Sequence, residues 1–262
     1  MGNSRLLPKR FKRFRESVVE DSGVNLRGNC LDFGTKTSKF SCMARFSKTV
    51  LFIIGHIPGF SIKYKNTNWF MKFLGVCVWL FNRRFMTNYT TTLKWTVYFP
   101  SEKFVKDDAD RAVSILMHEF IHLWDRKQKG IAFSLLYALP QGGVILPLGL
   151  LLSIGWFIPW WGNLILGLLA ILFLMPWPAP WRMLHEMRGY TMNLAYDYWL
   201  YGANMDKEDS FIAGQFTGWG YYSMWHFHKD IQARIDHVED DIKNDRLDEP
   251  FRLAKNFLKE IP

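Results

Sequence analysis

The sequence is poor in cysteine, and its cysteines follow no recognisable pattern. Cys30, Cys42 and Cys77 are the three it contains, and no two of them form a CxxC pair. This spacing excludes a thiolate zinc site built from CxxC pairs, and it gives no disulfide framework. We therefore expect a protein of a reducing compartment.

Ionisable side chains are missing between residues 131 and 181. This stretch of 51 residues contains no Asp, Glu, Lys, Arg or His, although charged residues make up 22% of the chain. A run of this length suffices for two helices across a bilayer about 30 Å thick. It predicts an apolar helical hairpin in or on the membrane, with arms at 136–157 and 164–177 and a turn at 159–163.

Two alternatives to a spanning hairpin stay open. Pro140, Gly142 and Gly143 interrupt the first arm, which is compatible with a shallow hairpin that does not cross the membrane. A buried core hairpin in a soluble protein is the other alternative. The tryptophans that would mark the membrane interfaces are Trp156, Trp160, Trp161, Trp177 and Trp181.

The net charge of +9 is unevenly distributed. Residues 1–48 are polar and basic without clear periodicity, which predicts a tail with at most a short helix. Such a tail either contacts anionic lipid or nucleic acid or stays solvated. No recognisable nucleic-acid-binding module accompanies it, so we expect no specific nucleic-acid partner. The basic residues that crowd its start are Arg5, Lys9, Arg10, Lys12, Arg13 and Arg15.

The rest of the chain predicts an α+β fold that is mainly α. The apolar runs 49–62 and 69–81 are too short to span a bilayer, so we expect buried helices or interfacial segments there. Residues 89–99 are dense in β-branched and aromatic residues, typical of a strand or hairpin. Acidic residues followed by apolar residues at helical spacing predict a helix over 108–127. Further helices are expected after residue 182.

The helix predicted at 108–127 contains the pattern HExxH, formed by His118, Glu119 and His122. Two histidines four residues apart project from one face of a helix, so both imidazoles can reach a zinc ion at about 2.0–2.1 Å. Glu119 lies beside them, where it can take a proton from water at the metal. The motif therefore predicts a catalytic zinc site.

A catalytic zinc site needs a third protein ligand and a position open to water. Glu186 is the best candidate, because it stands just after the apolar segment, and a hairpin returns the chain to the side it left. Glu186 as a plain surface carboxylate stays open as an alternative. The rival ligands are His185, His226 and His228.

HExxH followed at a distance by a ligand glutamate resembles the gluzincin metallopeptidases. The apolar segment between the two is similar to the insertion in membrane proteases of the CaaX-processing and heat-shock type. Those proteases place an aspartate four residues after the ligand glutamate, where this chain has Tyr190. The resemblance covers roughly residues 89–195, with HExxH as its one sharply specific element.

The resemblance implies further roles for particular residues. The strand before the HExxH helix, here 91–99, would pair with an extended substrate. Asp125, three residues after His122, would hold the outer nitrogen of His118 or His122. The candidates to stabilise the oxyanion are Tyr221, Tyr222, His226 and His228. The alternative for each is a packed aromatic or surface residue without a role in catalysis.

Taken together, the sequence predicts a membrane-associated zinc metallopeptidase that hydrolyses peptides or proteins. The expected divisions are a basic tail at 1–48, a first catalytic part at 49–130, the apolar hairpin at 131–181 and a second catalytic part at 182–262. A membrane-anchored protein in which zinc only joins two helices is the alternative function. Basic residues flank the hairpin and place the site on the cytoplasmic side, namely Lys127, Lys129, Arg182 and Arg188.

Overall fold

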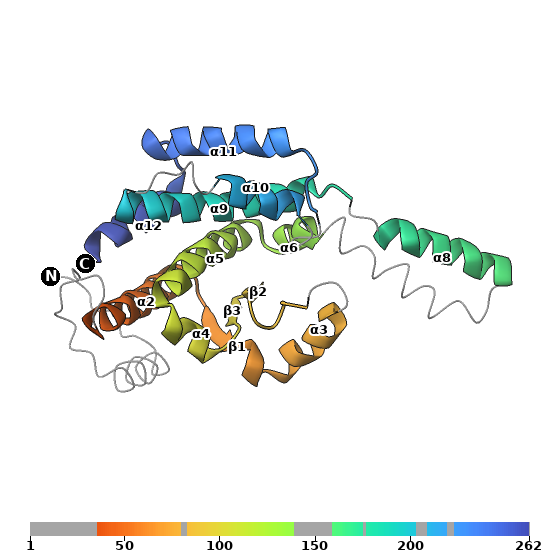
Figure 1. The fold of residues 1–262 in the computed structure, drawn as a ribbon, viewed down its shortest axis with the longest axis horizontal. Helices are drawn as coiled ribbons and strands as arrows, with labels where there is room; N and C mark the ends of the chain where they lie inside the picture. The colour runs from red at the N-terminus through yellow and green to blue at the C-terminus, as the bar shows by residue number, and fades with distance from the viewer. Residues whose placement is uncertain are drawn as a thin grey trace.

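The structure is a computed structural model of the chain. It describes residues 36–79, 83–138, 159–174, 177–202, 209–218 and 223–261. Within these ranges the chain is mainly helical and carries one small three-stranded sheet, which confirms the α+β, mainly α prediction. The helices stack in layers, with the sheet on one side of the central helix α5 (Figure 1).

Helix α5 (Ala109–Lys129) carries the HExxH motif and confirms the helix predicted over 108–127. Its N-terminus is capped by the side chain of Asp108, which accepts a hydrogen bond from the backbone N–H of Arg111. Its C-terminus is closed by Gly130, whose positive φ of 59° favours glycine. The helix packs against α2 and α9, so most of its middle is buried.

The sheet lies beside α5 and has the strand order β1-β3-β2. Strand β1 (Ser61–Tyr64) runs parallel to β3 (Thr96–Phe99), and β2 (Thr91–Leu93) pairs antiparallel with β3. The hairpin signal at 89–99 is thus confirmed. The central strand is β3, however, so within the predicted strand 91–99 only β2 lies at an edge of the sheet.

Helix α9 (Pro180–Tyr201) separates two hydrophobic cores. Met192 and Tyr196 join the core formed with α2, β3 and α5. Met187 and Leu194 join a second core with α10 (Asp209–Thr217) and α11 (His228–Lys243). Because α9 is held on both sides, its position against α5 is fixed by packing. Helix α12 (Glu249–Glu260) closes the first core.

The prediction of a tail over 1–48 is wrong for its last part. Helix α2 (Lys36–His56) begins within it and buries Phe46, Val50 and Ile53 in the core shared with α5. Before residue 49 the apolar residues are interspersed with polar and basic ones, so the amphipathic pattern is weak, and contact with α5 decides the outcome. Residues 1–35, including the basic cluster, lie outside the described residues.

The first apolar run ends earlier than its length suggests, because Pro58 and Gly59 turn the chain after α2. Gly59 adopts a φ of 81°, and β1 follows. The second run forms α3 (Trp69–Trp79), preceded by the short 3₁₀ helix η1 (Lys65–Thr67). Helix α4 (Glu102–Asp107) connects the sheet to α5.

The apolar segment is described only in part. Helix α6 (Ile131–Ala138) covers its start and α8 (Trp160–Leu174) its second arm, while 139–158 of the first arm lie outside the described residues. The turn predicted at 159–163 is wrong, because α8 already begins at Trp160, and Gly162 donates its N–H to the carbonyl of Pro159. No helix in the described ranges is both long and apolar enough to cross a membrane.

Candidate metal centre

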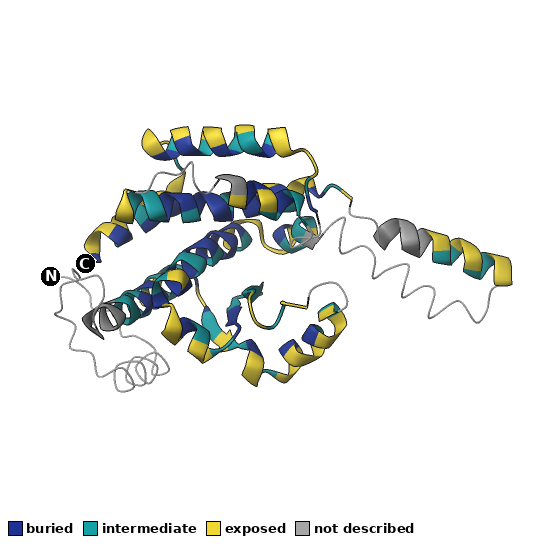
Figure 2. Ribbon diagram, in the orientation of Figure 1, coloured by how far each residue is buried: buried dark blue, intermediate teal, exposed yellow. Residues whose placement is uncertain are grey.

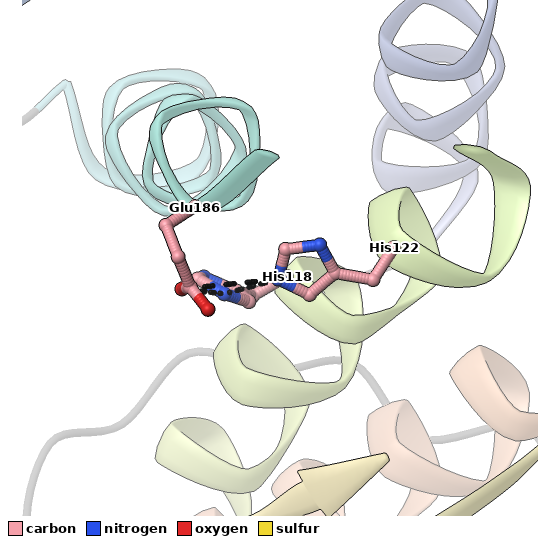
Figure 3. A group of neighbouring side chains, drawn as sticks. All are labelled: His118, His122 and Glu186. Carbon is pink, nitrogen blue, oxygen red and sulfur yellow. Dashed lines mark hydrogen bonds and ion pairs between the residues drawn. The ribbon is translucent and has the colours of Figure 1, made fainter. Parts of the chain in front are cut away.

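Helices α5 and α9 bring three potential metal ligands together (Figure 3). The Nε2 atoms of His118 and His122 lie 3.1 Å apart. Oε2 of Glu186 lies 3.6 Å from the former and 3.9 Å from the latter. All three side chains are buried, and within the described residues they form the one group that could hold a metal ion.

The spacing of these atoms suits zinc. Ligands at about 2.0–2.1 Å in a tetrahedral arrangement lie about 3.3 Å from one another. The three separations between the ligand atoms lie on both sides of this value, so small side-chain movements would bring all three atoms to coordination distance. Two imidazole nitrogens and one carboxylate oxygen form a donor set typical of catalytic zinc, which leaves one position for another ligand.

One buried polar atom at the centre also fits a cation. Oε2 of Glu186 has no hydrogen-bond partner among the described residues. A buried carboxylate oxygen without a donor is costly, and a cation between Oε2 and the two Nε2 atoms removes that cost. The residues present therefore fit a bound metal ion.

The orientation of His118 is fixed by Asn193 of α9. Nδ1 of His118 donates a hydrogen bond to Oδ1 of Asn193 at 2.7 Å. The amide of Asn193 donates in turn to the carbonyl and the hydroxyl of Ser114, which fixes which way the amide faces. With its proton on Nδ1, the imidazole keeps the lone pair of Nε2 for a metal.

Gly189 allows α9 to approach α5 closely at the site. A Cβ atom at this position would lie 2.4 Å from Nε2 of His118 and 2.5 Å from Cε1. These separations are far below van der Waals contact. A glycine is therefore required between Glu186 and Asn193 if both are to reach their partners.

The mutual charges of the site shift its pKa values. Burial raises the pKa of Glu186, but contact with His118 and the charge of His122 outweigh burial and lower this pKa to about 2. Burial lowers the pKa of His118, and the contact with Glu186 outweighs it, so the net shift is upward. Burial dominates for His122 and lowers its pKa. Glu186 is therefore a carboxylate at neutral pH, as a metal ligand must be.

Glu119 lies next to the ligands and is held by the edge strand of the sheet. The hydroxyl of Thr92 on β2 donates to Oε2 of Glu119 at 2.6 Å. This short bond to a carboxylate is charge-assisted and restricts the rotation of the Glu119 side chain. The candidate base is thus positioned by the sheet as well as by its own helix.

Helix α6 covers the centre with aromatic side chains. The hydroxyl of Tyr137 donates to Oε1 of Glu186, and its ring stands edge-on to His122 at 5.8 Å. Phe133 packs against Tyr137 and lies 4.6 Å from the ring of His185. Oε1 of Glu186 is therefore hydrogen-bonded to Tyr137, and Oε2 is the oxygen that faces the two histidines.

The role predicted for Asp125 is wrong. Asp125 accepts hydrogen bonds from Nδ1 of His185 and Nε of Arg188, both at 3.1 Å. Burial raises the pKa of Asp125, but His185 and Arg188 outweigh burial, and the net shift is downward. The carboxylate is directed to α9 because the Arg188 guanidinium offers a stronger, charge-assisted bond than a neutral imidazole.

The rival histidine ligands do not join the three ligands. His185 is buried and bonded to Asp125, while His226 and His228 are exposed. None of the three belongs to the group that could hold a metal. Tyr221 and Tyr222 lie outside the described residues. Tyr190, which stands where the resembling proteases have aspartate, packs edge-on against His118 at 5.1 Å.

Four residues of the site were not predicted from the sequence: Asn193, Gly189, Thr92 and Tyr137. The sequence did contain a signal for Gly189 and Asn193, because they lie three and seven positions after Glu186 and so share its face of the helix. An amide and a glycine on that face are what a ligand helix needs to hold a histidine and to approach closely. Thr92 and Tyr137 reach the site through the placement of β2 and α6, which no spacing in the sequence indicates.

No family model, curated protein or solved structure matches this chain. The comparisons with known proteins therefore assign it to no family.

Proposed function

We propose that this protein is a membrane-associated zinc metallopeptidase of the gluzincin type. The observation that carries the proposal is the convergence of His118, His122 and Glu186 from two helices, with Glu119 beside them. Three protein ligands leave one position open at a tetrahedral ion, as hydrolysis requires. Zinc is the metal that this donor set favours.

When bound, zinc supplies Lewis acidity, which polarises a carbonyl and lowers the pKa of water to about 7. Glu119 accepts a proton from the attacking water and passes it to the nitrogen of the leaving amine. The bond from Thr92 engages Oε2 of Glu119, and Oε1, which does not share this bond, is the oxygen proposed to accept the proton. Asn193 holds His118 in the tautomer that can bind the metal.

The substrate proposed for this site is an extended peptide. Strand β2 is an edge strand, and its Thr92 side chain contacts the base, so a peptide added to this edge would run past Glu119. Such β-augmentation uses backbone hydrogen bonds and tolerates many side chains. The scissile carbonyl would then be held beside the three ligands.

Membrane association belongs to the same proposal. Residues 131–181 lack any ionisable side chain, and the described part of α8 exposes large apolar side chains. We place this segment in or on the bilayer as a helical hairpin, with the basic residues at its ends keeping the site on the cytoplasmic side. The exposed side chains that favour this placement are Trp160, Trp161, Leu164, Ile165 and Leu168.

The test combines metal content with cleavage of a generic peptide library. Wild type is expected to carry one zinc, and Glu119→Gln to keep it while cleavage falls by about 100-fold or more, because general-base catalysis contributes about 10²–10⁴-fold. Glu186→Ala should lose both zinc and cleavage. Glu260→Gln, an exposed carboxylate at the end of α12, is the matched control and should change neither.

A peptide hydroxamate separates catalysis from a purely structural zinc. A metal with an open position binds the hydroxamate, whereas a closed structural site does not. If the protein carries zinc but neither binds the hydroxamate nor cleaves peptides, the peptidase proposal is refuted and the protein is a zinc-stabilised structural protein. Absence of zinc after metal-replete purification would refute the site itself.

A further inference from the structure

Helix α3 exposes an apolar face that no described element covers. The exposed fractions of Trp69, Phe73 and Val76 are 77%, 62% and 74%. These three positions follow the spacing i, i+4, i+7, so they form a continuous stripe along the helix. The opposite face is buried at Met71 and Gly75, and Gly75 lies against the side chain of Met86. Figure 2 shows α3 as largely exposed.

The chain segment that contains this stripe carries charge of a single sign. No Asp or Glu occurs between Asp32 and Glu102, although this segment contains ten Lys and Arg residues. Within the described part of it, Lys72 on α3 and Arg83 and Arg84 shortly after α3 are exposed. An apolar stripe with cations beside it and no carboxylate in its segment is complementary to an anionic, apolar surface.

The side chains at the two ends of α3 also suit a lipid interface. Trp69 opens the helix and Trp79 closes it, and the guanidinium of Arg83 lies 5.1 Å from the ring of Trp79. Tryptophan at both ends and basic side chains beside it are typical of helices that lie at the level of lipid headgroups. A helix of 11 residues is about 16 Å long and cannot span a bilayer.

We propose that α3 lies flat in the headgroup region of an anionic bilayer, as a membrane contact separate from the apolar segment 131–181. Trp69, Phe73 and Val76 enter the acyl boundary, while Lys72, Arg83 and Arg84 meet the lipid phosphates. A second copy of the chain is the poorer occupant, because a symmetric contact would bring together two copies of a basic segment that contains no carboxylate. This proposal requires neither a metal nor hydrolysis.

Cys77 provides a local reporter, because it is a free, exposed cysteine on α3 itself. The full chain with Cys30→Ser and Cys42→Ser would carry an environment-sensitive fluorophore on Cys77. It would be mixed with or reconstituted into phosphatidylcholine vesicles, with or without phosphatidylglycerol. The reference label is placed at Lys229→Cys on α11, also exposed, in a chain that has Cys77→Ser as well.

On vesicles that contain phosphatidylglycerol, the Cys77 label should emit at shorter wavelength and be quenched by nitroxide-bearing lipid. The Lys229→Cys label should show neither effect. Phe73→Glu combined with Val76→Glu should abolish both effects at Cys77, whereas Phe227→Glu, at an exposed apolar residue just before α11, should leave them unchanged. Added salt should weaken the response, because it screens the basic side chains.

Three results would overturn the proposal. One is a Cys77 label that stays solvent-exposed on anionic vesicles while the apolar segment keeps the protein bound to them. Another is an equal response on pure phosphatidylcholine, which removes the role of the basic residues. The third is a lipid-independent shift that grows with protein concentration, which would assign this face to a second copy of the chain.

Discussion

Gly189→Ala is the substitution that most directly tests the geometry of the metal centre. It adds a single methyl group on α9, at the point where the helix passes the imidazole of His118. The new Cβ would lie 2.4 Å from Nε2, 2.5 Å from Cε1 and 2.9 Å from Cδ2 of that ring. Carbon and nitrogen atoms in good contact lie about 3.5–4.0 Å apart, so the ring or the helix must move by about 1 Å.

A displacement of this size is incompatible with coordination but not with folding. Metal–ligand distances tolerate about 0.2 Å, so His118 would be lost as a ligand. Loss of a hydrogen-bond partner behind a ligand already costs about 10–100-fold in affinity, and loss of the ligand should cost more than about 100-fold. Overpacking destabilises by about 1–3 kcal/mol, which the better helix propensity of alanine offsets by about 0.8–1.0 kcal/mol.

The assay is zinc affinity by competition with a chromophoric chelator, together with thermal unfolding of the metal-free protein. Gly214→Ala on α10 is the matched control, because a Cβ there meets nothing within 4 Å. It should leave zinc affinity unchanged and slightly stabilise the protein. If folded Gly189→Ala bound zinc as tightly as wild type, α9 would not approach His118 as described, and the proposed site geometry would be refuted.

Three further predictions concern the residues around the ligands. Asn193→Ala should lower zinc affinity by about 10–100-fold, measured by chelator competition, because Nδ1 of His118 loses its acceptor. Thr92→Val should lower kcat in the peptide assay with zinc content unchanged, while Thr92→Ser, which keeps the hydroxyl bonded to Glu119, should restore it; equal rates for the two variants would contradict a positioning role. The pKa of Asp125 in the folded protein lies below its ordinary value of 3.8, so the ionised carboxylate stabilises the folded state above pH 3.8. This stabilisation is lost as the pH falls through the pKa that Asp125 has in the folded protein. The unfolding temperature of wild type should therefore fall more steeply below about pH 4 than that of Asp125→Asn, and parallel curves would argue against this linkage.

The helix with its HExxH motif could be predicted from the sequence because all its signals are local. The capping aspartate, the apolar spacing and the histidine pair lie within one stretch of chain, and helical geometry relates them directly. The hairpin at 89–99 was predictable for the same reason. The start of α2 was not, because its burial depends on contact with α5 rather than on a strong pattern of its own.

The partners of Asp125 could not be predicted from the sequence. The resemblance to the membrane proteases, with Asp125 three residues after His122, implied a bond to His118 or His122. Only the packing of α9 against α5 reveals that Arg188 and His185 are closer and offer better donors. Competition among side chains from different elements is decided in three dimensions and leaves no trace in the spacing.

The sequence by itself determined the pair of histidines, the adjacent glutamate and the mainly helical character, since these follow from periodicity within single elements. It also proposed Glu186, but only as one of several candidates. The tertiary structure decided that Glu186 faces the histidines, that Asn193 orients His118 and that Thr92 holds Glu119. These relations join residues 27 to 75 positions apart, and such long-range contacts are set by how the helices and strands pack rather than by local pattern.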